Sequence, residues 1–243
     1  MKKIRISLLP WYFILSMLTL SVHAGNAEHP GDTHYDDAGF FDIHVCNWPD
    51  RAPFYMALFS TFRFNEVKSI ELINASGDQF ASLDLSKYRV IKADKKPEKR
   101  VFINQVAQPK KFADGWFSAK VTLTDGTVHI TRDFVQHGLL SIVDDVQPTS
   151  HEQLIEIPKT LSWTPVAGAG YYQVFIKDKW DMGKVIFSSK ILHDAKVELP
   201  DDLLEYGGNY VWQVHARDVN EDIKLGDFNL GSLSSWYEFS VAD

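Results

Sequence analysis

The sequence predicts an all-β protein built from two β-sandwich modules. Short runs of alternating apolar residues recur between turn signals, as in residues 41–45, 172–176 and 210–216. No stretch after residue 24 shows the 3.6-residue apolar period of a long amphipathic helix. Many short strands separated by turns at this spacing are typical of a sandwich or a barrel.

The clearest hairpin signal is the Asp125-Gly126 pair, which separates residues 120–124 from residues 127–131. Both residue types tolerate positive φ angles. The pair therefore predicts a two-residue type I′ turn between two antiparallel strands.

The first 24 residues have the three parts of a secretory signal peptide. Lys2, Lys3 and Arg5 precede an apolar stretch at residues 8–20, and a small-residue site ends at Ala24. The apolar stretch is shorter than the roughly 20 residues that a membrane span needs. We therefore expect cleavage near Ala24, no membrane span, and a mature protein that is periplasmic or secreted.

Charge and cysteine content restrict the mature chain further. Its net charge moves from −7 to −10 when the three cations of the signal peptide are removed, so we expect an acidic, soluble protein. Cys46 is the single cysteine, which excludes an internal disulfide. An unpaired cysteine is typical of a small buried apolar residue, the alternatives being an intermolecular bridge or a reactive thiol.

Domain boundaries are predicted from a gap in the strand pattern at residues 143–151, a polar stretch that contains Pro148. We expect a signal peptide at 1–24 and a polar leader at 25–39. We expect a first module at 40–143, a linker at 144–152 and a second module at 153–243.

Three motifs in the second module carry a resemblance. Residues 161–174 contain Trp163, residues 204–218 contain Tyr210, and residues 234–241 contain Phe239. In this order they resemble the second and third strands, the corner with the sixth strand, and the closing strand of a fibronectin type III domain. The resemblance implies a seven-stranded sandwich with Trp163 buried and the Tyr210 hydroxyl bonded to upstream backbone. It also implies a role in adhesion, spacing or recognition, with no active site.

The first module carries no such set of motifs. Its strand signals at residues 54–61, 67–73, 101–106 and 116–135 suggest an immunoglobulin-like sandwich.

A basic segment in the first module is one candidate binding surface. Between residues 87 and 111 nine lysines and arginines stand against two acids. Such a patch attracts an acidic protein or the phosphates of envelope lipids, and we select Lys95, Lys96, Lys99 and Arg100 as binding residues. The alternative is a solvated loop. No nucleic-acid-binding motif accompanies the patch, so nucleic acid is not expected.

The loop predicted at residues 218–233 is a second candidate, with Asp218 and Asp222 as its binding residues. It begins like a calcium-binding loop, but Ile223 replaces the required glycine and Asn229 the required glutamate. We therefore expect an acidic recognition loop, or a plain acidic surface, and no metal site.

Tryptophans provide a third candidate. Trp180 and Trp236 have no clear place in the predicted core, and an exposed pair on a sandwich can stack on sugar rings or anchor a protein. Trp48 and Trp116 are expected to pack inside the first module.

Catalytic motifs are absent from the sequence, which contains no G-x-S-x-G, C-x-x-C or phosphate-loop pattern. Asp42, His44 and Cys46 alternate along one predicted strand, but neighbours there lie about 6.5 Å apart, too far to chelate one ion unaided. We therefore expect an exported, non-catalytic interaction or scaffold protein without a cofactor, which binds a protein or an envelope component. The alternatives are a carbohydrate-binding module and, less favoured, a thiol or metal-dependent enzyme around Cys46.

Overall fold

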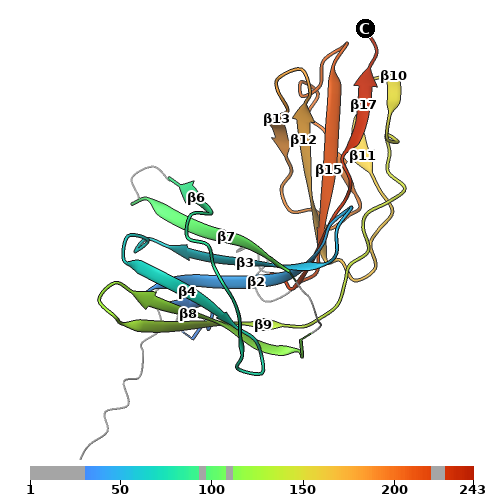
Figure 1. The fold of residues 1–243 in the computed structure, drawn as a ribbon. Helices are drawn as coiled ribbons and strands as arrows, with labels where there is room; N and C mark the ends of the chain where they lie inside the picture. The colour runs from blue at the N-terminus through green and yellow to red at the C-terminus, as the bar shows by residue number, and fades with distance from the viewer. Residues whose placement is uncertain (1–30, 93–96, 108–111, 220–227) are drawn as a thin grey trace, which may run out of the picture.

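The computed structural model describes residues 31–92, 97–107, 112–219 and 228–243. Within these residues all regular structure is β, arranged as two sandwiches (Figure 1), which confirms the predicted fold class. The described part of the chain has no helix long and apolar enough to cross a membrane. The predicted signal peptide lies outside the described residues, as do Lys95, Lys96 and Asp222.

The first sandwich has two facing antiparallel sheets. One contains β2 (Gly39–Asn47), β3 (Phe54–Thr61), β7 (Lys99–Ala107) and β6 (Tyr88–Ile91), in that order, with the short β1 (Tyr35–Asp36) on β2. The other contains β5 (Gln79–Ser82), β4 (Val67–Ile73), β8 (Gly115–Leu123) and β9 (Val128–Val135). Counted from β2, this is the A-B-E-D and C′-C-F-G strand order of immunoglobulin-type sandwiches.

Alternate residues of these strands form the first core. Phe41 and Ile43 of β2 are fully buried, and Phe117 and Val121 of β8 meet them from the opposite sheet. This is the period-two pattern from which the strands were predicted.

The segment that we expected to be a polar leader takes part in this sandwich from its second half onward. Tyr35–Asp36 pair with Gly39 and Phe40 at the start of β2, and Ala38 is buried in the first core. Residues 34–38 therefore pack against the first module.

The hairpin at Asp125-Gly126 joins β8 to β9 as predicted, but its turn differs from the predicted type. Only Gly126 has a positive φ, of 89°, and its N–H donates to the carbonyl of Leu123. Leu123 in turn donates to the carbonyl of Thr127. This is a three-residue loop with a left-handed glycine at its end. The Asp125 carboxylate accepts the backbone N–H and the hydroxyl of Thr127, and these two bonds stabilise the loop.

The second sandwich also has two sheets. The larger contains β13 (Lys184–Ser188), β12 (Tyr171–Asp178), β15 (Asn209–Arg217), β17 (Tyr237–Val241) and β10 (Glu152–Ile155), with β10 parallel to β17. The smaller pairs β11 (Thr160–Ser162) with β14 (Lys196–Glu198). Trp163 is buried in the core between them, next to Tyr172 and Trp212, as the sequence implied.

A tyrosine-centred turn closes the end of this sandwich that lies beside the C-terminus (Figure 1). The backbone N–H of Glu205 donates to the Tyr210 hydroxyl at 2.8 Å, which is the upstream bond that the sequence implied. Gly208 makes room for the ring, since a Cβ there would lie 2.3 Å from the hydroxyl oxygen.

The connection between the modules packs against the second one. Leu140, Val143 and Val146 are all buried in the second core. The chain therefore joins the second sandwich from residue 140, ahead of the linker expected at 144–152.

A further strand, β16 (Leu230–Leu233), joins the two modules inside the segment expected to be a loop at 218–233. It pairs antiparallel with β15 and parallel with β2, so that among the described residues one hydrogen-bonded sheet runs through both sandwiches. Leu230 packs against both cores. From this seam the strands of the second sandwich rise away from those of the first (Figure 1).

Candidate functional site: the outer face of β8 and β9

Strand β9 exposes apolar side chains and buries polar ones, the reverse of the orientation that its sequence predicts. Val128, Ile130 and Phe134 are 45%, 49% and 39% exposed, whereas Thr131 and Asp133 between them are 0% and 1% exposed. A strand on the surface of a sandwich normally places its apolar residues inward. Burying polar side chains in this way costs free energy, which contacts on the buried side of the strand offset.

Asp133 makes the central contacts on that side. One carboxylate oxygen accepts the backbone N–H of Ile43 at 2.8 Å, and the other lies 3.1 Å from His34 Nε2. His34 Nδ1 lies 2.7 Å from a carboxylate oxygen of Asp32. The pKa of Asp133 is raised to about 6, chiefly by burial and also by the nearby Asp42 carboxylate, while His34 opposes the shift.

Two more contacts fasten the N-terminal segment along β9. Asp36 pairs with His129 Nδ1, and the backbone N–H of Arg132 donates to the carbonyl of Thr33 at 2.8 Å. Residues 32–36 thus supply partners to Asp133, His129 and the Arg132 backbone, whereas the buried Thr131 hydroxyl has no hydrogen-bond partner among the described residues. The period-two rule alone would have placed the opposite face of this strand inside.

Trp116 on β8 extends the apolar surface that the inversion creates. It is 45% exposed and lies directly opposite Phe134 in the β8–β9 register, with ring centroids 5.4 Å apart at 77°. The expectation that Trp116 packs inside the module is therefore wrong. The predicted two-residue turn would have set residue 116 against the buried Val135, and the observed three-residue loop shifts this pairing by one residue, to Phe134.

We define the β8–β9 face as the exposed outer side of these two strands, formed by Trp116, Val128, Ile130, Arg132 and Phe134. Tryptophan and arginine are the residue types that most often dominate the energy of a protein interface. The exposed apolar side chains on this face, with Arg132 and Lys120 between and beside them, make it a candidate interaction site.

The described residues of the basic segment lie at the opposite sheet. The Arg100 guanidinium carbon is 4.0 Å from the Phe64 ring centroid and 4.4 Å from that of Tyr88. Lys99 lies over Phe62 at 5.4 Å, and partial burial lowers its pKa. Both cations therefore belong to a basic and aromatic margin beside β6.

The two selected tryptophans lie in different parts of the second module. Trp180 is 74% exposed in the turn between β12 and β13, where its backbone N–H donates to Asp178. Trp236 is 39% exposed just before β17, and the Lys177 ammonium lies 4.0 Å from its ring centroid. No ring contact joins the two indoles in the part of the chain that the structure describes.

The Asp218 side chain forms hydrogen bonds with the backbone of the protein itself. One carboxylate oxygen accepts the N–H groups of Asn229 and Leu230, at 2.9 and 2.8 Å, and so fixes the start of β16. Burial raises the pKa of Asp218. Among the described residues no group of three or more histidine, cysteine, aspartate or glutamate side chains is arranged to hold a metal ion.

The Asp42, His44 and Cys46 side of β2 is buried. His44 stacks on Phe228 at 3.9 Å and contacts Asp42 through Nδ1 at 3.1 Å. Cys46 is 2% exposed, and burial raises the pKa of its thiol to about 12, with a further contribution from Asp42. The thiol is therefore protonated at neutral pH, which deprives it of nucleophilic character.

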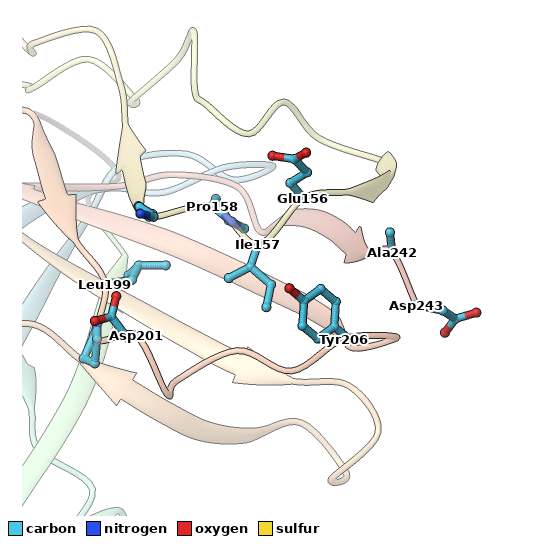
Figure 2. A pocket seen from close by; sticks show the side chains of 10 residues that line it. Glu156, Ile157, Pro158, Leu199, Asp201, Tyr206, Ala242 and Asp243 are labelled. Atoms are coloured by element: carbon cyan, nitrogen blue, oxygen red, sulfur yellow. The ribbon is translucent and has the colours of Figure 1, made fainter.

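A cavity of about 550 Å³ lies at the end of the second module where β10 and β17 terminate (Figure 2). Its rim carries Glu156, Asp201 and Asp243, and the 73% exposed Tyr206 stands beside Ile157. None of the residues selected from the sequence lies in it.

Fold and surface together define a class, a two-module sandwich of the immunoglobulin type with an exposed apolar sheet face. No protein-family model and no curated protein matches the chain. Solved structures align over most of it at low similarity. Dpr11 IG1 bound to DIP-gamma has 10% identity and a TM-score of 0.23, covering 84% of this chain and 99% of that one.

Two bacterial structures align similarly. Latent PorU of Porphyromonas gingivalis has 11% identity and a TM-score of 0.27, covering 84% of this chain. SGBP-B of Bacteroides ovatus, in complex with a mixed-linkage heptasaccharide, has 11% identity and a TM-score of 0.23, covering 81%. The alignments span 20% and 42% of those two chains.

Proposed function

We propose that this chain is an exported, non-catalytic interaction protein that binds a protein partner of the cell envelope through the β8–β9 face. The observation that carries the proposal is the inverted β9. Asp133 is paired with Ile43 and His34, and His129 with Asp36, while the buried Thr131 hydroxyl has no hydrogen-bond partner among the described residues and the apolar side stays in contact with water. These contacts hold β9 in an orientation that leaves apolar side chains in water. A partner that covers those side chains explains this arrangement.

The shape of the face favours a protein over a sugar. A sugar ring stacks on a flat, open aromatic face, whereas Trp116 and Phe134 meet nearly edge to face at 77°. The aliphatic side chains of Val128 and Ile130, farther along the same face, would add buried area to a protein interface. Arg132 adds a charged donor at the same surface.

The carbohydrate alternative rests on Trp180, the most exposed of the tryptophans considered above. Lys177 occupies space over the Trp236 ring. The enzyme alternative rests on Cys46, whose raised pKa and burial disfavour nucleophilic chemistry.

We infer that the second module is of the fibronectin type III kind. The buried Trp163, the Glu205–Tyr210 bond and the order of the three sequence motifs support this inference. In this view the second module positions the first, with export by cleavage of the signal peptide near Ala24.

Site-specific photo-crosslinking tests the interaction. A photoreactive phenylalanine derivative in place of Phe134 is expected to crosslink one envelope protein, and the same group in place of Tyr206, at the free end of the second module, is not. The crosslink should be lost in Ile130→Asp. With that partner purified, Trp116→Ala should weaken binding about thirtyfold, the effect of losing a central tryptophan anchor.

The competing functions have their own readouts. Binding to a glycan array that disappears in Trp180→Ala, with no crosslink from position 134, would overturn the proposal in favour of a carbohydrate-binding module. A crosslink from position 134 only to a second copy of this chain would also overturn it.

A further inference from the structure

The β6 strand is an open edge of the first sandwich. Strand order in its sheet ends at β6, and all four of its residues are exposed. No strand in the described residues pairs with its outer side. An unpaired edge offers backbone donors and acceptors to another extended chain.

The register identifies which backbone groups are open. The N–H of Ile103 donates to the carbonyl of Lys87, which makes this a hydrogen-bonded position of the β6–β7 ladder. Antiparallel ladders alternate, so residues 89 and 91 face β7 as well. The N–H and C=O of Tyr88 and Val90 therefore point away from β7.

Charge decides which chain can use this edge. Lys87, Arg89 and Lys92 lie on or beside β6, with Lys99 and Arg100 on β7, against the acids Asp84 and Glu98. Asp84 lies 3.5 Å from Lys87, and Glu98 lies 3.5 to 3.6 Å from Arg100 and Lys92. Arg89 forms no ion pair with the described residues, so the edge retains a net positive charge.

A second copy of β6 is a poor occupant, because pairing two identical edges brings their cations opposite each other. An acidic segment meets these cations with favourable cross-strand pairs. Exposed side chains of Phe62, Tyr88, Val90 and Ile91, at 52%, 41%, 46% and 49%, give the segment apolar surface to cover.

We propose that the β6 edge binds an extended acidic segment of a protein partner by β-strand addition, with Tyr88 and Val90 supplying the backbone hydrogen bonds. This site lies on the sheet opposite the β8–β9 face and does not depend on the function proposed for that face. Strand addition takes its affinity from main-chain bonds and its selectivity from the flanking side chains.

A short peptide of alternating glutamate and valine is a suitable probe, measured by amide chemical shifts and by titration. Binding should shift the amide signals of Tyr88 and Val90 most. Raising the salt concentration should weaken it, since the flanking charges are exposed. A peptide with lysine in place of glutamate should not bind.

Val90→Pro tests the hydrogen-bonding mode. The variant removes an N–H that points away from β7, and edge strands tolerate proline in such a position. Peptide affinity should fall about tenfold, the effect of losing one or two hydrogen bonds. Val90→Thr keeps the N–H and should bind normally.

Charge and backbone are tested separately. Arg89→Glu with Lys92→Glu should abolish binding, and charge reversal of Lys190 and Lys196 on the second module should not. A peptide methylated on alternate backbone nitrogens should lose affinity. Equal affinity of the methylated peptide, or of Val90→Pro, would overturn strand addition.

Strand addition at β6 and partner binding at the β8–β9 face can be refuted independently of each other. Trp116→Ala should leave peptide binding at β6 unchanged. Loss of the β6 result together with a persistent crosslink from position 134 would refute strand addition and leave the proposed function standing.

Discussion

At the residue scale, Asp133 decides which side of β9 is buried. It is 1% exposed and contacts the backbone of Ile43 and the ring of His34. A leucine in its place would leave these two groups without their partner, at a cost of about 1–3 kcal/mol for each buried polar group. The contacts of Asp133, together with the burial of Val135 in the first core, therefore favour the orientation that exposes the apolar face.

The raised pKa of Asp133 predicts a pH effect on stability. Its pKa is about 6 in the folded protein against 3.8 for the ordinary carboxyl group. The folded state therefore holds the proton more tightly, and this contribution is present at acid pH and is lost as the pH rises through about 6.

Asp133→Asn should remove this effect. The amide oxygen still accepts the Ile43 N–H, and its NH₂ group donates to a neutral His34 ring. We compare the free energies of unfolding of variant and parent by urea denaturation at pH 5 and pH 8. The difference between them should shift in favour of the variant at pH 8. Asp194→Asn, at an exposed position, serves as the control. An equal difference between parent and Asp133→Asn at both pH values would contradict the assignment.

At the element scale, the tyrosine-centred turn fastens the loop before β15 to that strand. The Tyr210 ring is buried and packs beside Phe239, and its hydroxyl oxygen accepts the Glu205 N–H. The bond closes a six-residue turn, from Glu205 to Tyr210, without any regular ladder. Its contribution is that of one hydrogen bond between a partly buried donor and acceptor.

Tyr210→Phe should therefore lower the free energy of unfolding by about 1 kcal/mol, measured by urea denaturation. Tyr206→Phe is the matched control, because its side chain is 73% exposed, and a change within about 0.5 kcal/mol is expected. An unchanged stability in Tyr210→Phe would mean that water replaces the bond at no cost.

At the scale of the whole molecule, β16 unites two sandwiches that the sequence presents as separate. It is hydrogen-bonded to β15 of one and β2 of the other, and Leu230 packs on both cores. A further bond crosses the seam, from the Asn47 side chain to the Leu140 carbonyl, and the Ser232 hydroxyl holds β16 to the connection through the Ser141 carbonyl. We expect the two modules to unfold together.

Leu230→Ala should destabilise both modules, by about 2 kcal/mol for a partly buried leucine. Amide hydrogen exchange should accelerate in β3 and in β15 alike, because global opening limits both. Leu139→Ala, at a 55% exposed neighbouring position, should change neither. Faster exchange in only one of the two strands would show that the modules unfold independently.

The sequence by itself determined the local features of this protein. Alternating apolar residues predicted the strands, Asp125-Gly126 located a hairpin, and the motif around Tyr210 implied its upstream bond, because each depends on neighbours within a few residues. The burial of Cys46 agrees with the tendency of unpaired cysteines to be buried.

Tertiary structure alone decided the features that depend on distant partners. Val128, Ile130 and Phe134 resemble an inward-facing set until His34 and Ile43 are found around Asp133, about 90 residues away in the chain. A strand inside the segment 218–233 forms only because β2 and β15 together provide its ladder. The exposed β8–β9 face and the joined sheet thus arise from contacts between segments that no local pattern relates.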